Sequence, residues 1–213
     1  MKTYIFDFDG TLVDSMPTWS GVMKKILDDT NTPYTSDLIK IITPLGNAGT
    51  AKYYTEIGCP LSYEEIIEAM NGYMIKEYSE NVPAKDTVIE ALKEMKARGD
   101  SLNVLTASSH RTLDPCLKRL GIFDMFDNVW SCDDFGTSKT DPEIYCAAAE
   151  RLGKKTSDII FVDDNLGADK TAKAAGMTVY GIYDDSSADY VDDIKASTDA
   201  YVYEFKEVLT LDL

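Results

Sequence analysis

The sequence predicts an α/β protein: a Rossmann-like parallel sheet core of five or more strands with a small all-helical domain inserted after the first strand. Three observations predict it. Short β-rich runs alternate with helical patterns along most of the chain. One of these runs, Ile159–Val162, is apolar throughout, as expected for a central strand buried on both faces. Residues 15–80, which separate the first two strands, have the pattern of amphipathic helices instead.

The elements follow in chain order. The predicted strands are Tyr4–Phe8, Leu102–Leu105, Asn128–Ser131, Ile159–Val162 and Thr178–Ile182. In the insertion, an apolar stripe with i, i+3, i+4, i+7 spacing is formed by Trp19, Val22, Met23, Ile26 and Leu27. Ser62 and Glu65 form a capping box before a second stripe. We therefore expect a core of residues 1–14 and 81–213 and a helical domain of residues 15–80.

Two later helices have clear boundary signals. A helix over Val88–Lys96 is expected to stop at Gly99, and Asp141-Pro142 is an N-cap followed by proline at the first helical position. Asp114-Pro115 predicts another helix start, which leaves Ala107–Leu113 as a loop. His110 and Arg111 lie on that loop, where their charge would attract an anionic ligand, although a solvated surface loop is the favoured interpretation.

Composition narrows the classes of partner. The 213-residue chain has a formal net charge of −16 and a pI of about 4.4, which disfavours nucleic acid and anionic membranes. No apolar run approaches the length of a membrane span, and no signal peptide precedes the first strand. Four scattered cysteines are typical of a reduced, cytoplasmic protein. We expect a monomer or weak homo-oligomer that binds a small molecule.

Two pairs of acids follow apolar strands. Asp7 and Asp9 share one face at the end of the first strand, and Asp163 and Asp164 end the strand at Ile159–Val162. Ligands of open α/β sheets bind at such strand ends. Gathered there, the carboxylates would raise one another's pKa values unless a hard cation such as Mg²⁺ bound them. Either pair alone fits a turn or helix cap equally well, but two pairs favour a metal site. A carboxylate outside the metal's inner sphere would be free to attack phosphorus.

Four segments resemble the motifs of the haloacid dehalogenase superfamily, in the right order and over nearly the whole chain. "DFDGTLVDS" resembles the first motif, "LTAS" at residues 105–108 the second, "SKTDPEIY" at residues 138–145 the third, and "FVDDNLGADKTAKAAGM" at residues 161–177 the fourth. The branch with β-phosphoglucomutase-like enzymes and phosphatases carries a helical cap, which the insertion at residues 15–80 resembles.

The resemblance implies a Mg²⁺-dependent phosphatase acting on a small phosphorylated metabolite, such as a sugar phosphate. Asp7 would be the nucleophile that forms an aspartyl-phosphate, and Asp9 the acid and base. The metal would be bound by the Asp7 and Asp164 side chains and the Asp9 carbonyl, with Asp163 as a further metal partner. The phosphoryl group would be held by Gly10, Thr106, Ala107 and Lys139. On physical grounds, Lys139 supplies charge, and Gly10 leaves backbone N–H groups after Phe8 open to an anion.

Some positions depart from the family pattern. The second acid that some phosphatases carry four residues after the metal-binding aspartate is Ala168 here, with Asp169 next to it. Ser138 and Thr140 replace the usual glycine and proline beside Lys139, so we expect a loop that is held differently. True dehalogenases carry tyrosine in place of Asp9. Dehalogenation is therefore rejected, since phosphoryl transfer needs an acid there to protonate the leaving group.

Three functions can be distinguished by experiment. The alternative to the phosphatase is a β-phosphoglucomutase-like mutase, which would isomerise a hexose 1-phosphate rather than release phosphate. A non-catalytic binding protein of the same fold is less favoured, because every residue that the chemistry requires is present. "TPLGNAGTAKYY" at residues 43–54 is the candidate recognition loop of the helical domain, although its Lys52 equally fits an ordinary surface lysine.

Overall fold

The computed structural model describes residues 1–211 of the chain, apart from the side chain of Pro44. It forms two compact units. One consists of Met1–Asp14 and Pro83–Leu213, and the other of Ser15–Val82. The chain thus passes from the first unit into the second after its first strand, and returns at Pro83.

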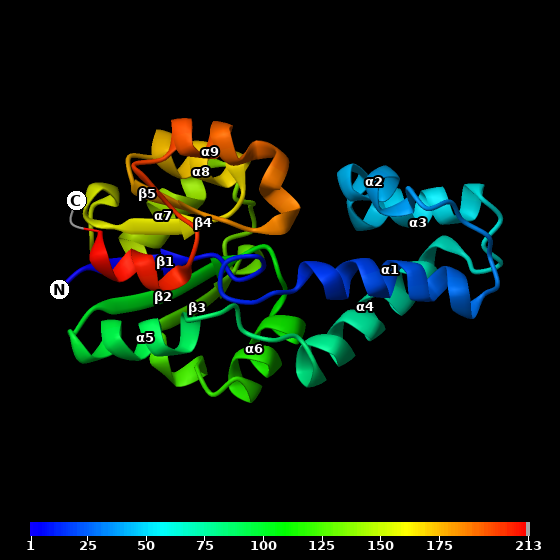
Figure 1. Cartoon of the computed structure of the whole chain (residues 1–213), viewed down its shortest axis with the longest axis horizontal. Coiled ribbons are helices and arrows are strands. Elements are labelled where there is room, and N and C mark those ends of the chain that lie inside the picture. Colours follow the sequence, from blue (N-terminus) through cyan, green and yellow to red (C-terminus); the bar gives the residue numbers. More distant parts are fainter. Residues whose placement is uncertain (212–213) are drawn as a thin grey trace. The chain divides into compact units, whose positions relative to one another are not determined.

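The first unit is built on a parallel sheet (Figure 1). Its described strands are β1 (Thr3–Phe6), β2 (Ser101–Thr106), β3 (Asn128–Ser131), β4 (Ile160–Asp163), β5 (Thr178–Ile182) and β6 (Ala200–Val202). They lie in the order β3-β2-β1-β4-β5-β6, and all pairs are parallel. The predicted fold class is confirmed. Strand β6 was not predicted, because a three-residue strand is too short for alternation to be recognised.

Helices cover both faces of this sheet (Figure 1). They are α5 (Val88–Ala97), α6 (His110–Arg119), α7 (Pro142–Arg151), α8 (Leu166–Ala174) and α9 (Val191–Ser197). On one face, Ile5, Phe161 and Val179 lie side by side in register and pack with apolar residues of α7 and α8. On the other face, Phe6 packs against Phe205 with ring centroids 5.4 Å apart. A sheet buried on both faces explains why its central strands are continuous apolar runs.

The helix boundary signals have different outcomes. Asp141 accepts from the backbone N–H of Glu143 and caps α7, as predicted, and Gly99 has a φ of +81° just after α5. The predicted loop over Ala107–Leu113 is wrong, because α6 begins at His110 and contains Pro115. Proline there removes one helical hydrogen bond near the first turn. Leu113, Cys116 and Leu117 are buried on the same helix, so packing offsets that loss.

The second unit is helical and has its own core. Its helices are α1 (Met16–Asp29), α2 (Leu38–Ile42), α3 (Gly46–Glu56) and α4 (Tyr63–Glu80). The predicted stripe of α1 contributes its buried side chains to that core, and the Ser62–Glu65 capping box begins α4 with both of its hydrogen bonds. Residues 43–54 form a short 3₁₀ turn and most of α3, in which Thr50, Ala51 and Tyr54 are buried.

Candidate active site

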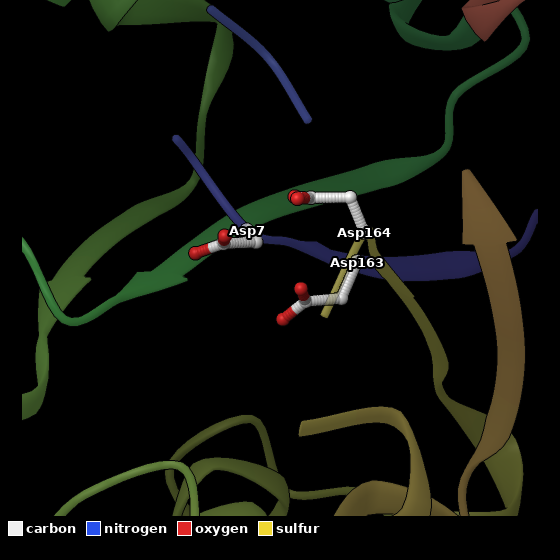
Figure 2. A group of neighbouring side chains, drawn as sticks. All are labelled: Asp7, Asp163 and Asp164. Atoms are coloured by element: carbon white, nitrogen blue, oxygen red, sulfur yellow. The ribbon is translucent and has the colours of Figure 1, made fainter. Parts of the chain in front are cut away.

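The candidate site lies at the carboxyl ends of three neighbouring strands. Asp7 directly follows β1, Asp163 is the last residue of β4, Asp164 comes next, and Thr106 ends β2. The sheet order changes direction between β1 and β4, the place where open α/β sheets bind ligands. One carboxylate oxygen from each of Asp7, Asp163 and Asp164 lies within 4.8 Å of the other two (Figure 2). The fold therefore brings together acids that are far apart in the sequence.

Asp7 continues the line of β1, since its backbone N–H donates to the Val162 carbonyl at 2.9 Å. Its side chain is buried, and its Oδ1 lies 2.7 Å from the ammonium nitrogen of Lys139 in an ion pair without hydrogen-bond geometry. Burial raises the pKa of Asp7 to about 7; the Lys139 charge opposes this shift, and Asp163 and Asp9 add to it.

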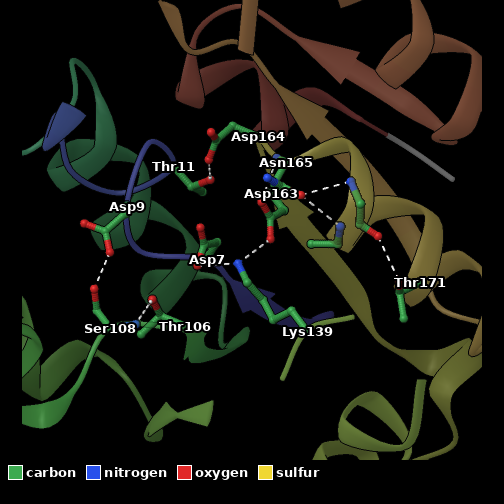
Figure 3. Close-up of polar contacts among 12 residues, drawn as sticks. Asp7, Asp9, Thr11, Thr106, Ser108, Lys139, Asp163, Asp164, Asn165 and Thr171 are labelled. Carbon is green, nitrogen blue, oxygen red and sulfur yellow. Dashed lines mark hydrogen bonds and ion pairs between the residues drawn. The ribbon is translucent and has the colours of Figure 1, made fainter. Parts of the chain in front are cut away.

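Lys139 lies between two acids from different strands (Figure 3). Its ammonium nitrogen is 2.7 Å from Asp7 and donates to Asp163 Oδ2 at the same distance. Burial lowers the pKa of Lys139, but the charges of Asp163 and Asp7 outweigh burial and raise that pKa well above its usual value. Lys139 is thus a fixed positive charge inside an acidic site.

The loop that carries Lys139 is held by the hydroxyl of Tyr145 and by a contact between two hydroxyls of its own. Tyr145 lies on α7, and its hydroxyl is 3.1 Å from the Lys139 carbonyl and 3.2 Å from the Ala168 carbonyl. This hydroxyl therefore links the loop before α7 to α8. The Ser138 and Thr140 hydroxyls, which replace the family's glycine and proline, contact each other at 2.8 Å on either side of Lys139.

Asp164 is buried and held by the first motif. The Thr11 hydroxyl, itself fully buried, donates to Asp164 Oδ1 at 3.0 Å (Figure 3). Burial, followed by the charges of Asp163 and Asp7, raises the pKa of Asp164 well above its usual value. The charge of Lys139 opposes this rise in the pKa of Asp164 but does not cancel it.

Gly10 is required in this site for two reasons. Its φ is +78°, and a Cβ atom added to it would lie 2.6 Å from both carboxylate oxygens of Asp164. The expected open N–H groups are only partly available. The Gly10 N–H donates to the Val13 carbonyl, and the Leu12 N–H donates to the Phe8 carbonyl, which closes the turn on itself.

Asp9 lies apart from the three clustered carboxylates. It is half-buried and accepts a short hydrogen bond from the Ser108 hydroxyl (Figure 3). Thr106 is buried at the end of β2, and its hydroxyl accepts from the Ser108 backbone N–H at 3.1 Å, whereas Ala107 is exposed. Ser108 was missed by the sequence analysis, although it belongs to the second motif, because a serine in a loop carries no signal of what it contacts.

His110 and Arg111 are on the first turn of α6 rather than on a loop. The His110 ring contacts Asp114 through Nδ1 at 2.8 Å and Asp134 through Nε2 at 2.9 Å. Arg111 is exposed. His110 therefore contacts two acids of the protein while its side chain stays partly exposed to solvent.

Two further charged residues were not predicted. Lys85, at the return from the helical unit, donates to the Gly10 carbonyl at 2.6 Å and to Asp184 Oδ2 at 2.9 Å. Asp169, the acid beside Ala168, is fully buried on α8, and neither of its carboxylate oxygens has a hydrogen-bond partner among the described residues. Neither Lys85, which lies outside the motifs, nor Asp169, which lies within the fourth, carries a sequence signal of its burial.

The donors fit a hard divalent cation. The clustered groups are all carboxylates, the ligands that Mg²⁺ prefers, and among the described residues the buried Asp7 Oδ1 is contacted by the Lys139 ammonium without hydrogen-bond geometry. Asp163 accepts at both oxygens, from Lys139 and from the Asn165 backbone N–H, so it is the most fully bonded of the three. Asp7 and Asp164 are the members with capacity left for a metal ion.

Acids and a lysine that converge at the strand-order switch of a parallel sheet, with helices on both of its faces, are the arrangement of a hydrolase of the haloacid dehalogenase type. The chain matches the haloacid dehalogenase-like hydrolase family over residues 1–176 and belongs to it. It is 31% identical to the pyrophosphatase PpaX of Bacillus velezensis, covering 84% of this chain and 81% of the relative. It is 27% identical to a phosphorylated carbohydrates phosphatase of Thermotoga maritima, covering 85% of each chain.

Solved structures agree with this assignment. A crystal structure from Thermotoga maritima, described as a candidate beta-phosphoglucomutase, has a TM-score of 0.84 at 25% identity and covers 99% of this chain and 97% of its own. CbbY from Rhodobacter sphaeroides, in complex with xylulose-(1,5)bisphosphate, has a TM-score of 0.81 at 18% identity over the full length of both chains, which establishes likeness of fold. Within the described residues, no helix combines the length and apolar character needed to cross a bilayer.

Proposed function

We propose that this protein is a Mg²⁺-dependent phosphatase that hydrolyses a small phosphomonoester, of the sugar phosphate class, through an aspartyl-phosphate on Asp7. The observation that carries the proposal is the convergence of Asp7, Asp163 and Asp164 within 4.8 Å, with the Lys139 ammonium between Asp7 and Asp163. Membership of the hydrolase family and likeness to phosphatases, one of them acting on phosphorylated carbohydrates, support it.

Asp7 and Asp9 have separate roles in this proposal. A carboxylate oxygen of Asp7 attacks phosphorus while the ester P–O bond breaks, and Asp9 gives its proton to the leaving alcohol oxygen. In the second half, water attacks the same phosphorus, Asp9 takes the water proton, and the P–O bond to Asp7 breaks to release phosphate. The Ser108 hydroxyl bound to Asp9 fixes the direction of that carboxyl group.

The phosphoryl oxygens are held by Lys139, by Thr106 and by the backbone near Gly10 and Ala107. Lys139 suits this role because its pKa is raised, so it stays charged while negative charge builds on the transferring group. Asp163 keeps Lys139 in place through their 2.7 Å hydrogen bond. Asp7, Asp164 and the Asp9 carbonyl would hold Mg²⁺, which supplies further neutralisation of phosphoryl charge when bound.

The helical unit and its loop at residues 43–54 are proposed to select the organic part of the substrate, as caps of this family do. All four cysteines lie in the described part of the chain and are free thiols, which supports a cytoplasmic enzyme. The net charge of −16 supports a small anionic substrate attracted by local positive charge rather than a nucleic acid or membrane partner.

The direct test is Asp7→Asn, assayed for phosphate release from a panel of phosphate esters with Mg²⁺. We expect turnover to fall by at least a thousandfold, because an amide is not a nucleophile, while circular dichroism is unchanged. In the parent, beryllium fluoride should be trapped on Asp7 in the presence of Mg²⁺. Residual activity within tenfold of the parent would remove Asp7 from the nucleophile role.

A phosphomutase is the second candidate, favoured by the 0.84 TM-score to the candidate beta-phosphoglucomutase. Both activities use the same four motifs and differ in whether water or a bound sugar phosphate receives the phosphoryl group. Hexose 1-phosphate with a trace of the hexose bisphosphate separates them: free phosphate is expected here, and isomerised hexose phosphate would establish the mutase instead.

A further inference from the structure

We propose that Lys85 is a positioning residue for the candidate site: by binding the Gly10 carbonyl, it holds the turn of the first motif against Asp164 and so sets the affinity for Mg²⁺. The inference rests on the proposed metal-dependent function. Lys85 lies outside the four family motifs, in the segment that returns from the helical unit to α5.

All three protons of the Lys85 ammonium are used. The nitrogen lies 2.6 Å from the Gly10 carbonyl, 2.7 Å from the Tyr183 carbonyl and 2.9 Å from Asp184 Oδ2. Its side chain is 18% exposed and that of Asp184 6% exposed, so the pair is largely removed from water. A lysine with three acceptors in a shielded site is a fixed structural charge rather than a mobile surface group.

The backbone around Lys85 supports the same turn. The Lys85 N–H donates to the Leu12 carbonyl at 3.0 Å, the Asp14 N–H donates to the Pro83 carbonyl at 3.0 Å, and Val13 forms a β-bridge with Ala84. Residues 12–14 are thus held by backbone contacts to residues 83–85. The Lys85 ammonium adds a contact at Gly10, where the backbone is in the left-handed region.

The turn transmits this contact to Asp164. Gly10 lies so close that an added Cβ would be 2.6 Å from the Asp164 oxygens, and the next residue, Thr11, donates to Asp164 at 3.0 Å. A displacement of Gly10 would therefore remove its close packing against the Asp164 carboxylate and would move the Thr11 hydroxyl that orients this carboxylate. Loss of a group that hydrogen-bonds a metal ligand, as Thr11 does with Asp164, typically changes metal affinity by about 10- to 100-fold.

Lys85 has a second partner whose effect must be separated. Burial raises the pKa of Asp184, but hydrogen bonds from Ser186 and Lys85 outweigh burial and keep that pKa below its usual value. Removing Lys85 alone would leave a buried carboxylate without its cation, which destabilises the fold by itself. The informative variant is therefore Lys85→Met/Asp184→Asn, compared with Asp184→Asn, which keeps Lys85 and its contact with Gly10.

The test is Mg²⁺ titration by calorimetry, at a temperature where thermal unfolding shows each variant to be folded. We expect the dissociation constant to stay within threefold of the parent in Asp184→Asn and to rise 10- to 100-fold in the double variant. Phosphatase kcat of the double variant should recover at saturating Mg²⁺, which a general loss of structure would not allow. Lys96→Met is the matched control, because it removes a Lys–Asp pair of 2.8 Å at a distant surface.

Two results would overturn the inference. Parent-like Mg²⁺ affinity in the double variant would mean that Lys85 only neutralises Asp184. Equal weakening in Asp184→Asn and the double variant would assign the effect to Asp184. Absence of Mg²⁺ binding by the parent protein is a different outcome, which contradicts the proposed function itself.

Discussion

Asp169 is the residue whose environment is least explained by the proposed chemistry. It is fully buried on α8, and the described part of the chain offers it no hydrogen-bond donor; burial, with the charges of Asp163 and Asp164, raises its pKa to about 10. The folded protein therefore holds this proton at neutral pH, whereas the unfolded chain releases it near pH 4. The stabilisation that arises from this raised pKa of Asp169 is fully present below about pH 4 and is lost as pH rises toward 10.

Asp169→Asn should remove that pH dependence. The amide stays neutral in both states, so the parent should lose stability between pH 5 and pH 9 more steeply than the variant, by at most about 1.4 kcal/mol for each pH unit. Urea unfolding with EDTA at pH 5, 7 and 9 measures the two slopes. Asp192→Asn, an exposed acid on α9, is the control and should follow the parent. Parallel slopes for Asp169→Asn and the parent would show that Asp169 is not held protonated.

Among single residues, the acids at the strand ends could be predicted from the sequence, but the side chains that contact and orient the site could not. Asp7, Asp163 and Asp164 could be predicted, because parallel strands bring their carboxyl ends to one edge. Lys85 and Ser108 could not, because the groups that they contact come from segments far apart in the chain. The pattern likewise could not show that Asp163 is occupied by Lys139 and Asn165, while Asp164 accepts from Thr11.

The His110 contacts link α6 to the 3₁₀ turn after β3. The hydrogen bond to Asp114 raises the His110 pKa, burial opposes the shift, and Asp134 adds to it. Because the folded pKa lies above the unfolded value of 6.5, the stabilisation is complete below pH 6.5 and is lost as pH rises through the folded pKa. A neutral ring has one N–H and donates to only one of the two acids.

His110→Gln should therefore destabilise the protein at pH 6 and have little effect at pH 9. The His110 side chain is 41% exposed, so the difference at pH 6 should not exceed about 1 kcal/mol. Thermal unfolding of parent and variant across this range measures it. A difference that is constant with pH would indicate a packing role instead of a charge.

The loop at residues 43–54 can be tested as an element of selectivity. Exchanging four of its exposed residues, Leu45, Asn47, Ala48 and Lys52, leaves the buried Thr50, Ala51 and Tyr54 in the core of the helical unit. We expect kcat/KM for sugar phosphates to change at least tenfold, and that for p-nitrophenyl phosphate less than threefold. Glu64→Gln/Glu68→Gln on α4 is the control. Equal changes for both substrates would assign the loop a structural role.

Helix boundaries could be predicted from capping residues where these local contacts, rather than tertiary packing, determine where the helix begins. The Asp141 cap and the Ser62–Glu65 box were predicted because side chain and backbone satisfy each other within four residues. The start of α6 was mispredicted at Asp114-Pro115, since burial of Leu113 and Cys116 extends the helix past a proline. Tertiary packing, which the local pattern does not contain, determined that boundary.

The molecule as a whole carries excess negative charge, part of it buried at one site. Mg²⁺ should stabilise the fold, because it binds the folded protein and offsets the repulsion that raises the pKa values of Asp7 and Asp164. At a hundred times its dissociation constant, the gain should be about 2.7 kcal/mol, or about 5 to 10 °C in Tm. Differential scanning calorimetry with and without MgCl₂ measures it.

Two controls separate site binding from screening of the net charge of −16. NaCl at matched ionic strength should give a smaller shift, because it screens surface charge without binding the site. Asp164→Ala should lose the Mg²⁺-specific part of the shift and should bind Mg²⁺ far more weakly by calorimetry. An unchanged shift in Asp164→Ala would place the metal elsewhere.

The position of β1 in the middle of the sheet has a consequence for biosynthesis. Its partners, β2 and β4, follow it by long stretches of chain, and β4 ends only at Asp163. At ordinary translation rates, the apolar segment Thr3–Phe6 emerges roughly 8 to 30 s before its second neighbour. The helical unit, which has a core of its own, can fold on the ribosome during that delay, while the nascent first strand waits for both neighbours.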